Sequence, residues 1–225
     1  MIDTVGAVTT GELIGTGRQA DVYALDAHRV LRRYRDGTDT AREAEIMEHL
    51  SRFDFPIPRV YEVSGPDLIL ERLDGSTMTV AFTEGSLGMA EAAGCLAGLH
   101  RRLHALPTLD GRLADDRILH RDLHPENVML TSRGPVVIDW NNAVEGPPAV
   151  DVALTAVILG QAAVYPDHPL AGPARSFLAE FTRATGGEVR AGLDEAISVR
   201  SADPALTSDD VGRLSEVAAL VRLLS

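Results

Sequence analysis

The hydrophobic periodicity of this chain changes once, near residue 74, and this change limits the folds that it can adopt. Before residue 74, short runs with a two-residue alternation are bounded by glycine, proline and aspartate turns, which is typical of β-strands. After it, apolar residues recur at helical spacing almost to the C-terminus. We therefore predict a small, mainly β part of residues 1–74 and a larger, mainly α part of residues 75–225.

Strand and helix patterns fill both parts. In the first part we expect a five-stranded sheet, whose strands cover residues 11–15, 20–25, 29–34, 60–63 and 68–73. A helix covers residues 40–50, because Glu43, Ile46, Met47 and Leu50 fall on one stripe at helical spacing. The tripeptide Asp74-Gly75-Ser76 acts as a hinge or linker. Beyond it we expect helices at residues 89–106, 150–163, 170–185, 188–200 and 208–224.

Arginine supplies every basic side-chain charge in this acidic chain. Of its 225 residues 21 are basic, 33 are acidic and none is lysine, which gives a formal net charge of −12. Without lysine the chain cannot form a Schiff base or a phosphate-binding loop of the Gly-x-x-x-x-Gly-Lys-Ser/Thr kind. Its acidity argues against nucleic acid as a partner and suits a cationic ligand, although acidity also serves solubility alone.

Cysteine usage and hydropathy indicate a cytoplasmic protein. The single cysteine, Cys95, cannot form an internal disulfide, and residues 1–10 lack the basic and apolar segments of a secretory signal. The longest apolar stretch, residues 149–165, is interrupted by Asp151 and Gln161 and is too short for a membrane span. We expect this stretch to be a buried helix and expect no membrane partner.

A glycine turn separates the first two expected strands. It reads Gly15-Thr16-Gly17-Arg18-Gln19-Ala20-Asp21-Val22, and the strand alternation continues through Val22. A dinucleotide-binding fingerprint would instead start a helix at these glycines. A glycine loop between two strands lets backbone N–H groups approach phosphates, but an ordinary hairpin turn has the same pattern.

A second candidate feature is a cation on the third expected strand. Arg32 shares the inner face of this strand with Val30, whereas Arg33 points to the other face and should be solvated. Glu43 lies on the apolar stripe of the next helix, where a carboxylate needs a partner. We therefore expect an Arg32–Glu43 ion pair, with a coincidental surface pair as the alternative.

The most specific pattern lies in residues 119–140. It reads Leu-His-Arg-Asp-Leu-His-Pro-Glu-Asn-Val-Met-Leu and, after a turn, Pro-Val-Val-Ile-Asp-Trp, with Asp122, Asn127 and Asp139 in order. This pattern resembles the catalytic loop and metal segment of the protein-kinase-like superfamily, particularly its aminoglycoside phosphotransferase branch. His-x-Asp-Leu-His-Pro-x-Asn and Ile-Asp-Trp are typical of that branch, and the resemblance covers about residues 11–155.

The resemblance implies an α+β, two-lobed kinase-like fold, with a nucleotide-binding N-lobe of residues 1–74 and a C-lobe of residues 75–225. It implies transfer of the γ-phosphate of ATP, with Mg²⁺, to a hydroxyl of a small molecule such as an aminoglycoside, an amino alcohol or a sugar. The alternatives are a non-catalytic nucleotide-binding regulator and a protein Ser/Thr kinase. The retained Asp122, Asn127 and Asp139 argue against a regulator, and the short interval from Asp139 to Asp151 leaves no room for a full activation segment.

The resemblance also implies roles for single residues. Asp122 would orient the acceptor hydroxyl and take its proton, and Asn127 and Asp139 would bind Mg²⁺. Asp151 would brace the catalytic loop. Two departures from the family are Arg32, where lysine is usual, and Ala20, which replaces the third glycine. The residues implied in nucleotide binding are Gly15, Thr16, Gly17, Arg18, Ala20, Val22, Val30, Arg32, Glu43, Glu71 and Leu73.

The histidines allow a metal interpretation. His100 and His104, like His120 and His124, have the i, i+4 spacing of zinc ligands. However, His100 continues a core stripe, and Pro125 places His124 in a loop. We expect structural roles for these histidines, and we expect Cys95 to be a small buried hydrophobe.

Overall fold

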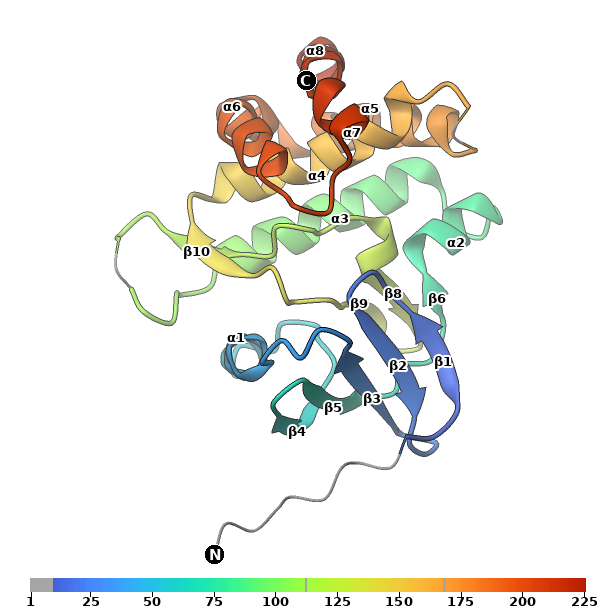
Figure 1. The fold of residues 1–225 in the computed structure, drawn as a ribbon. Helices are drawn as coiled ribbons and strands as arrows, with labels where there is room; N and C mark the ends of the chain where they lie inside the picture. Colours follow the sequence, from blue (N-terminus) through green and yellow to red (C-terminus); the bar gives the residue numbers. More distant parts are fainter. Residues whose placement is uncertain (1–9, 112, 168) are drawn as a thin grey trace, which may run out of the picture. The chain divides into compact units, whose positions relative to one another are not determined.

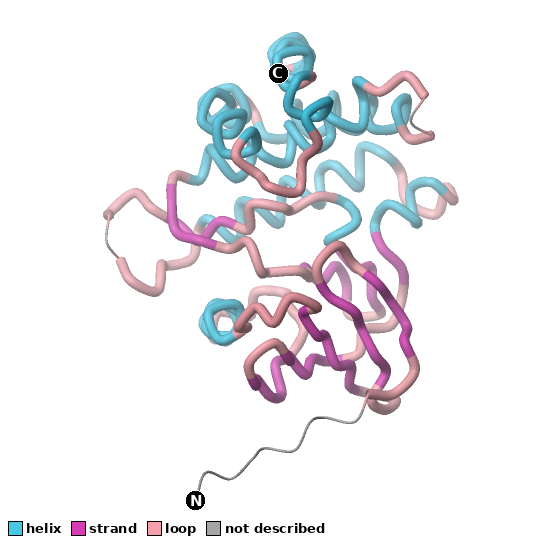
Figure 2. The backbone as a smooth tube through the Cα atoms, viewed as in Figure 1, coloured by secondary structure: helices cyan, strands magenta, loops and turns pink. Residues whose placement is uncertain are grey.

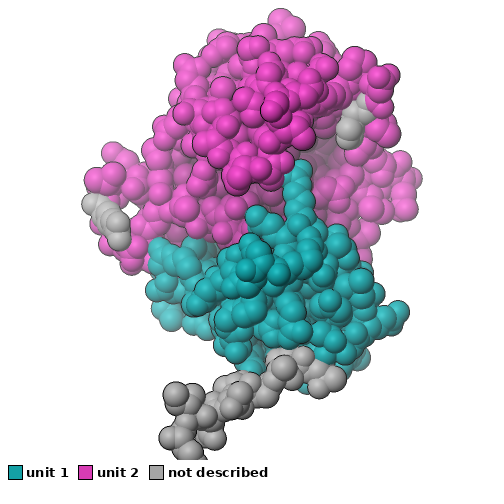
Figure 3. Space-filling model, viewed as in Figure 1, with its two compact units in different colours: residues 1–74 teal, residues 75–225 magenta. Residues whose placement is uncertain are grey.

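The structure is a computed structural model, and it describes residues 10–111, 113–167 and 169–225. The chain divides into two compact units, residues 1–74 and 75–225 (Figure 3). We call them unit 1 and unit 2. Strands are the main regular elements of unit 1, and helices are the main ones of unit 2 (Figure 1, Figure 2). The predicted α+β fold class is therefore confirmed.

Unit 1 is built on an antiparallel sheet with the strand order β1-β2-β3-β5-β4. Asp26 closes the turn between β2 and β3, because its Oδ1 accepts hydrogen bonds from the N–H groups of His28 at 2.7 Å and Arg29 at 2.8 Å. The predicted strands agree with the observed ones to within two residues at each end. The strands are β1 (Leu13–Thr16), β2 (Ala20–Ala24), β3 (Arg29–Tyr34), β4 (Val60–Ser64) and β5 (Asp67–Glu71).

Helix α1 (Ala41–Ser51) lies beside this sheet and packs against β4. Its opposite face carries an exposed ion pair between Arg42 and Glu45. The predicted stripe is the buried one, and it includes the carboxylate of Glu43. The buried residues of α1 are Glu43, Ala44, Ile46, Met47 and Leu50.

The start of unit 2 contains two elements that the sequence did not predict. Residues Ser76–Thr77 form β6, which pairs with β8 (Val128–Thr131), and Met78–Thr83 form the short helix α2. Gly75 has a φ of 93°, and a Cβ there would lie 1.9 Å from the Leu130 carbonyl oxygen. The expected linker is therefore held against β8, and only glycine fits at position 75.

Short strands and loops occupy residues 117–146. The β8–β9 hairpin is extended by β6 into a three-stranded sheet, and β10 pairs with β7. These ladders hold the loops that carry the predicted catalytic and metal-binding residues. The elements are β7 (Arg117–Leu119), the 3-10 turn η1 (Pro125–Asn127), β8, β9 (Gly134–Val137) and β10 (Val144–Gly146).

Helix α4 is the centre of the helical part of unit 2. It packs against α5, α6 and α8 (Figure 1) and buries most of its residues, as predicted for this apolar stretch. Across the described residues, no helix has the length and hydropathy needed to cross a membrane. The long helices are α3 (Met89–His104), α4 (Pro148–Val164), α5 (Ala171–Thr185), α6 (Glu188–Ser201) and α8 (Leu214–Leu224).

The single helix predicted for residues 208–224 is wrong. The chain forms α7 (Ser208–Gly212) and then α8, with Arg213 between them. Thr207 begins α7 with a capping box: its Oγ1 accepts from the Asp210 N–H at 3.2 Å, and the Asp210 carboxylate accepts from the Thr207 N–H at 2.9 Å. Gly212, a weak helix former, ends the first piece.

Candidate active site

The loop after β7 places Asp122 and Asn127 side by side. Nδ2 of Asn127 donates to the Asp122 carbonyl at 2.8 Å and lies 3.3 Å from Oδ2 of the Asp122 carboxylate. Asn127 ends η1, and this tight turn brings its side chain back toward Asp122. Its Oδ1 accepts no hydrogen bond from any residue that the structure describes. This oxygen can therefore bind a ligand.

Asp139 is linked to Asp122 and Asn127 through the hydrogen bonds of Ile138, the residue before it. The Ile138 N–H donates to the Asn127 carbonyl at 3.0 Å, and the Ile138 carbonyl lies 3.0 Å from Nε2 of His120. Asp139 follows directly. The predicted base and the two predicted metal ligands thus lie in adjacent, hydrogen-bonded loops of unit 2. Carboxylate and amide oxygens are the ligands that Mg²⁺ prefers, so the donor types fit this cation.

Backbone strain marks the same two loops. Among the described residues other than glycine, positive φ occurs at Asp54, at Arg121 with 66° and at Asp139 with 67°. A residue with a Cβ adopts this conformation at an energetic cost. Arg121 precedes Asp122, and Asp139 is itself a predicted ligand. Strain of this kind persists where the surrounding structure fixes a functional geometry, which supports the assignment of these loops.

His120 connects the two loops as a neutral scaffold. The side chain is buried, and its Nδ1 lies 3.3 Å from the Asp122 N–H, which donates to it. Nε2 therefore carries the ring proton and donates to the Ile138 carbonyl. Burial lowers the pKa of His120, which keeps the ring neutral. Trp140 packs against it, with ring centroids 4.6 Å apart.

Asp151, in the first turn of α4, braces the catalytic loop. Its carboxylate accepts hydrogen bonds from the N–H groups of His120 at 3.2 Å and Arg121 at 2.7 Å. Its Oδ2 also lies 3.0 Å from Nε2 of His104 and 3.4 Å from Nδ1 of His100. Burial raises the pKa of this carboxyl, but the neighbouring His100 and the hydrogen bond with His104 outweigh it and hold the pKa well below its usual range.

His100, His104 and Asp151 thus place three possible metal-ligand atoms within 4.8 Å of one another. The Asp151 carboxylate is already bound by two backbone amides. Nε2 of His100 lies 3.0 Å from Oγ1 of Thr155, which donates to the Leu123 carbonyl at 2.6 Å. We interpret the cluster as a hydrogen-bonded link from α3 and α4 to the catalytic loop, in line with the structural roles expected for the histidines.

The carboxyl group of Asp122 is held in its ionised form. Burial raises its pKa, but the neighbouring His124 and the charges of His120 and Arg200 lower it more, so the pKa lies below its ordinary value. Nε2 of His124 is 3.7 Å from Oδ2 of Asp122. The carboxylate is partly exposed. It can accept a hydrogen bond, and then a proton, from a hydroxyl group.

In unit 1, Arg32 and Glu43 form the predicted ion pair. Nη1 of Arg32 lies 2.6 Å from Oε1 of Glu43, and the two side chains are 11% and 5% exposed. The second carboxylate oxygen, Oε2, accepts from the Tyr34 hydroxyl at 2.8 Å. Both oxygens of Glu43 are therefore hydrogen-bonded, which is the condition for keeping its charge in the interior. Val22 is the cross-strand neighbour of Arg32.

The expectation that Arg33 is solvated is wrong. Its Nε and Nη2 donate to the two carboxylate oxygens of Asp67 at 2.6 Å and 2.5 Å. Asp67 begins β5 and is the cross-strand neighbour of Arg33 in the sheet. The alternation predicted the face on which Arg33 lies but not the carboxylate that meets it there.

The glycine turn is a loop between β1 and β2, as predicted. The Gly17 N–H donates to the Ala20 carbonyl at 2.8 Å, which closes the turn, and Thr16 and Arg18 are exposed. Neither Gly15 nor Gly17 has positive φ, and the nearest atom that a Cβ at Gly15 would meet is 3.7 Å away. The fold therefore does not itself require glycine at position 15. Bare backbone there suits the close approach of a phosphate.

Glu71 and Leu73, two of the residues expected to bind the nucleotide, lie at the end of β5 and just after it. The Glu71 N–H donates to the Arg59 carbonyl at 2.9 Å, so only the carbonyl of Glu71 could contact an adenine. The Leu73 N–H makes no hydrogen bond to the described part of the chain. A carbonyl and an N–H two residues apart match the donor and acceptor on one edge of adenine. Val30 is buried in β3 opposite Leu70.

The profile of the phosphotransferase enzyme family matches residues 10–117 and 101–195 of this chain. The chain belongs to the phosphotransferase enzyme family. The matched residues include the glycine turn, the Arg32–Glu43 pair and the loops of Asp122 and Asp139. The chain is accordingly a phosphotransferase. A search of curated proteins finds no match.

Solved structures of phosphotransferases share the fold. Aminoglycoside phosphotransferase APH(2'')-Ib with ADP bound is 14% identical, with a TM-score of 0.58 over 95% of each chain. A choline/ethanolamine kinase family protein from Mesorhizobium loti is 15% identical, with a TM-score of 0.56 over 97% of this chain and 94% of that chain. Amicoumacin kinase hAmiN, in complex with AMP-PNP, Ca²⁺ and Ami, is 13% identical, with a TM-score of 0.52 over 92% and 86%. The kinase-like fold expected from the resemblance is confirmed.

Sequence analysis of this phosphotransferase missed Arg200, near the end of α6. Its charge lowers the pKa of Asp122, its Nε donates to Gln161 Oε1 at 2.8 Å, and its Nη1 lies 2.9 Å from Oδ2 of Asp203. No motif or spacing connects position 200 to the catalytic loop. Only the packing of α6 against α4 brings the guanidinium near Asp122.

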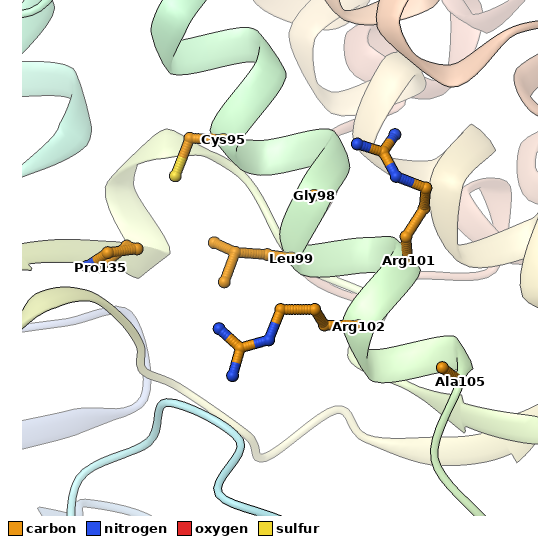
Figure 4. Close-up of a pocket in the computed structure, with 7 residues that line it drawn as sticks. All are labelled: Cys95, Gly98, Leu99, Arg101, Arg102, Ala105 and Pro135. Atoms are coloured by element: carbon orange, nitrogen blue, oxygen red, sulfur yellow. The ribbon is translucent and has the colours of Figure 1, made fainter.

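An open groove of about 510 Å³ runs along α3 of the phosphotransferase, and none of the predicted site residues is among those that line it (Figure 4). Its described lining contains no carboxylate, so it offers neither a base nor an anionic ligand for Mg²⁺. Cys95 is partly exposed at this groove, and the prediction that it is a small buried hydrophobe is wrong. The lining residues are Cys95, Gly98, Leu99, Arg101, Arg102, Ala105 and Pro135.

Proposed function

We propose that this phosphotransferase transfers the γ-phosphate of ATP to a hydroxyl of a small molecule, with Mg²⁺ as its cofactor. The observation that carries the proposal is the linkage of Asp122, Asn127 and Asp139 through the Asn127 amide and the Ile138 N–H. A base near the acceptor and oxygen ligands for a hard cation are the groups that phosphoryl transfer requires.

Asp122 is the group that we assign to the acceptor. Its ionised carboxylate orients the hydroxyl and takes its proton while the hydroxyl oxygen bonds to phosphorus and the bond from phosphorus to ADP breaks. A carboxylate with a low pKa is a weak base, which suits a loose transition state in which the proton moves late. The Asn127 amide and the His120 ring hold the Asp122 backbone, so the carboxylate keeps its position.

Oδ1 of Asn127 and the carboxylate of Asp139 would bind Mg²⁺. The cation supplies charge neutralisation for the phosphate oxygens. The chain prepares this site by turning the Asn127 amide nitrogen toward the Asp122 carbonyl, so that Oδ1 is directed elsewhere. It also fixes the backbone before Asp139 through both hydrogen bonds of Ile138.

The nucleotide-binding residues that we propose lie in unit 1. Arg32 would contact the phosphates as a planar, permanently charged fork, and Glu43 holds it in place. The backbone of the glycine turn would cover the phosphates. The Glu71 carbonyl and the Leu73 N–H would bind adenine.

The acceptor that we propose is an aminoglycoside-like molecule, an amino alcohol or a sugar. Structures with the same fold include a complex of APH(2'')-IIa with gentamicin, one of APH(2'')-IIa with streptomycin and ATP, and a choline/ethanolamine kinase family protein. The net charge of −12 favours a cationic acceptor within this group, because it raises the local concentration of cations.

A panel of acceptors tests the proposal. The protein is incubated with Mg²⁺ and ATP and with an aminoglycoside, choline, homoserine, a hexose or a macrolide, and ADP release is followed beside the mass of the acceptor. We expect one class to accelerate ADP release and to gain one phosphate, and we expect EDTA to abolish both effects. ATP hydrolysis that no acceptor accelerates, or an absence of ATP binding, would contradict the proposal.

A further inference from the structure

Arg35, the first residue after β3, donates hydrogen bonds to backbone carbonyl groups of the glycine turn. Its Nη2 donates to the carbonyls of Gly17, at 3.0 Å, and Arg18. Its Nη1 lies 2.6 Å from Oδ1 of Asp21, and its backbone N–H donates to the Gln19 carbonyl at 3.0 Å. One residue thus contacts three consecutive carbonyls of the turn and the carboxylate that follows them.

These contacts determine how the N–H groups of the turn point. In a trans peptide the carbonyl of one residue and the N–H of the next point in opposite directions, and the structure shows no cis peptide among its described residues. The carbonyls of Gly17, Arg18 and Gln19 point to Arg35, so the N–H groups of residues 18, 19 and 20 point away from it. The Arg18 N–H donates to no residue that the structure describes.

Successive N–H groups that point to one side form a site for an anion. The Arg35 guanidinium adds a positive charge on the carbonyl side of the turn, opposite the N–H groups. The carboxylate of Asp21 offsets part of this charge. The contact suits an arginine in particular, because its planar fork carries donors on separate nitrogens, one facing the carboxylate and one facing the two carbonyls.

We propose that Arg35 is a positioning residue for the phosphates of the nucleotide: it holds the turn so that its N–H groups face them. This inference rests on the proposed function, because it assumes that ATP binds at the glycine turn. Arg35 is not among the residues for which the resemblance implies a role, and its side chain is 43% exposed. Its loss should therefore affect the turn and leave the folding of unit 1 intact.

Arg35→Met tests the inference, because it keeps the stem of the side chain and removes the fork. Arg29→Met is the matched control: Arg29 begins β3, at the other end of the strand from Arg35, is 50% exposed and pairs with Asp26. Affinities for ATP and for adenosine are measured by calorimetry, with KM and kcat for ATP and a thermal midpoint for each variant.

For Arg35→Met we expect affinity for ATP to fall about tenfold, as for the loss of one or two hydrogen bonds. We expect KM for ATP to rise in parallel, with kcat, adenosine affinity and the thermal midpoint near wild type. Arg29→Met should match wild type throughout. Arg35→Lys should resemble Arg35→Met, because the three N–H groups of an ammonium radiate from one nitrogen and cannot reproduce contacts that the guanidinium makes from two separate nitrogens.

Three results would overturn the inference. They are wild-type ATP affinity in Arg35→Met, an equal loss of ATP and adenosine affinity, and full recovery in Arg35→Lys. Each of these leaves the proposed function standing, because the wild-type protein would still bind ATP and phosphorylate an acceptor. A wild-type protein that binds no ATP would overturn both.

Discussion

Asp122 is positioned by contacts of its backbone, while its carboxylate carries the charge that we assign to proton transfer. The Asn127 amide and the His120 ring bind its carbonyl and its N–H. Asp122→Asn should therefore keep the loop and remove the base. We expect turnover to fall about a hundredfold or more, with ATP affinity within about twofold of wild type. Calorimetry beside an ADP-release assay measures both, and unchanged turnover would refute the assignment.

His124 lowers the pKa of Asp122, whereas burial raises it. Removing the histidine leaves the burial in place, so the carboxyl pKa should rise. Because the ionised form is the active one, activity is lost as the pH falls through this pKa. We expect His124→Gln to move the acidic limb of kcat/KM to higher pH. The measurement is kcat/KM as a function of pH for wild type and variant. Acidic limbs that coincide would show that His124 does not lower the pKa of Asp122.

Arg32 and Arg33 are adjacent but have different partners, Glu43 and Asp67. If Arg32 contacts phosphate, Arg32→Ala should raise KM for ATP and reduce turnover about tenfold or more. Arg33→Ala should lower the thermal midpoint and leave KM for ATP near wild type. Kinetics and thermal unfolding of both variants test this. If Arg32→Ala leaves KM for ATP and turnover unchanged while Arg33→Ala raises KM and lowers turnover, the phosphate contact lies on the other face of β3.

Motif and alternation were sufficient to single out Asp122, Asn127 and Asp139, whose loops are hydrogen-bonded in the structure, and to predict the Arg32–Glu43 pair, because each depends on short spacing or on one face of one element. Arg33 shows the limit of that reasoning. Its partner Asp67 is 34 residues away, and only the pairing of β3 with β5 brings the two together. Arg35 and Arg200 were missed for the same reason, since their partners are set by tertiary packing.

Among the helices, α6 approaches α4 so closely that one position has no room for a side chain. A Cβ at Gly192 would lie 2.1 Å from the Ala149 carbonyl oxygen, whereas a Cβ at Gly94 in α3 would meet nothing within 4 Å. We expect Gly192→Ala to lower the free energy of unfolding by about 1–3 kcal/mol, because α6 must move away from the start of α4. Gly94→Ala should raise it by up to about 1 kcal/mol.

Urea denaturation of these two glycine variants provides the measurement. Each change places the same methyl group in a helix, so the difference between them reports the contact of α6 with α4. Equal shifts in the two variants would mean that this contact is looser than the structure indicates.

Elements with a long buried stripe could be predicted, and short ones could not. The five strands of unit 1 and helices α3 to α6 each repeat their buried pattern often enough to be recognised. Helix α2 has six residues and β6 has two, so neither completes a recognisable period. The break at Arg213 was missed because α7 buries none of its residues. The helical spacing of apolar residues in this region comes from the buried stripe of α8 alone.

The charge of the whole molecule should influence which acceptors it binds. A net charge of −12 attracts cations over several ångströms, and dissolved salt screens that attraction. We expect KM for a cationic acceptor to rise as salt increases from about 0.05 M to about 0.5 M, and KM for a neutral sugar to stay constant. Steady-state kinetics at several salt concentrations test this. Equal salt dependence for both acceptors would mean that the charge does not act on the acceptor.

Arg32 determines which chemical labels can detect this enzyme. Nucleotide analogues that acylate an ε-amino group depend on a lysine, and this chain contains none. The guanidinium of Arg32 stays protonated, is a poor nucleophile and is 11% exposed behind Glu43. Surveys of a proteome with lysine-directed ATP probes would therefore overlook this phosphotransferase even in a cell where it is abundant and active.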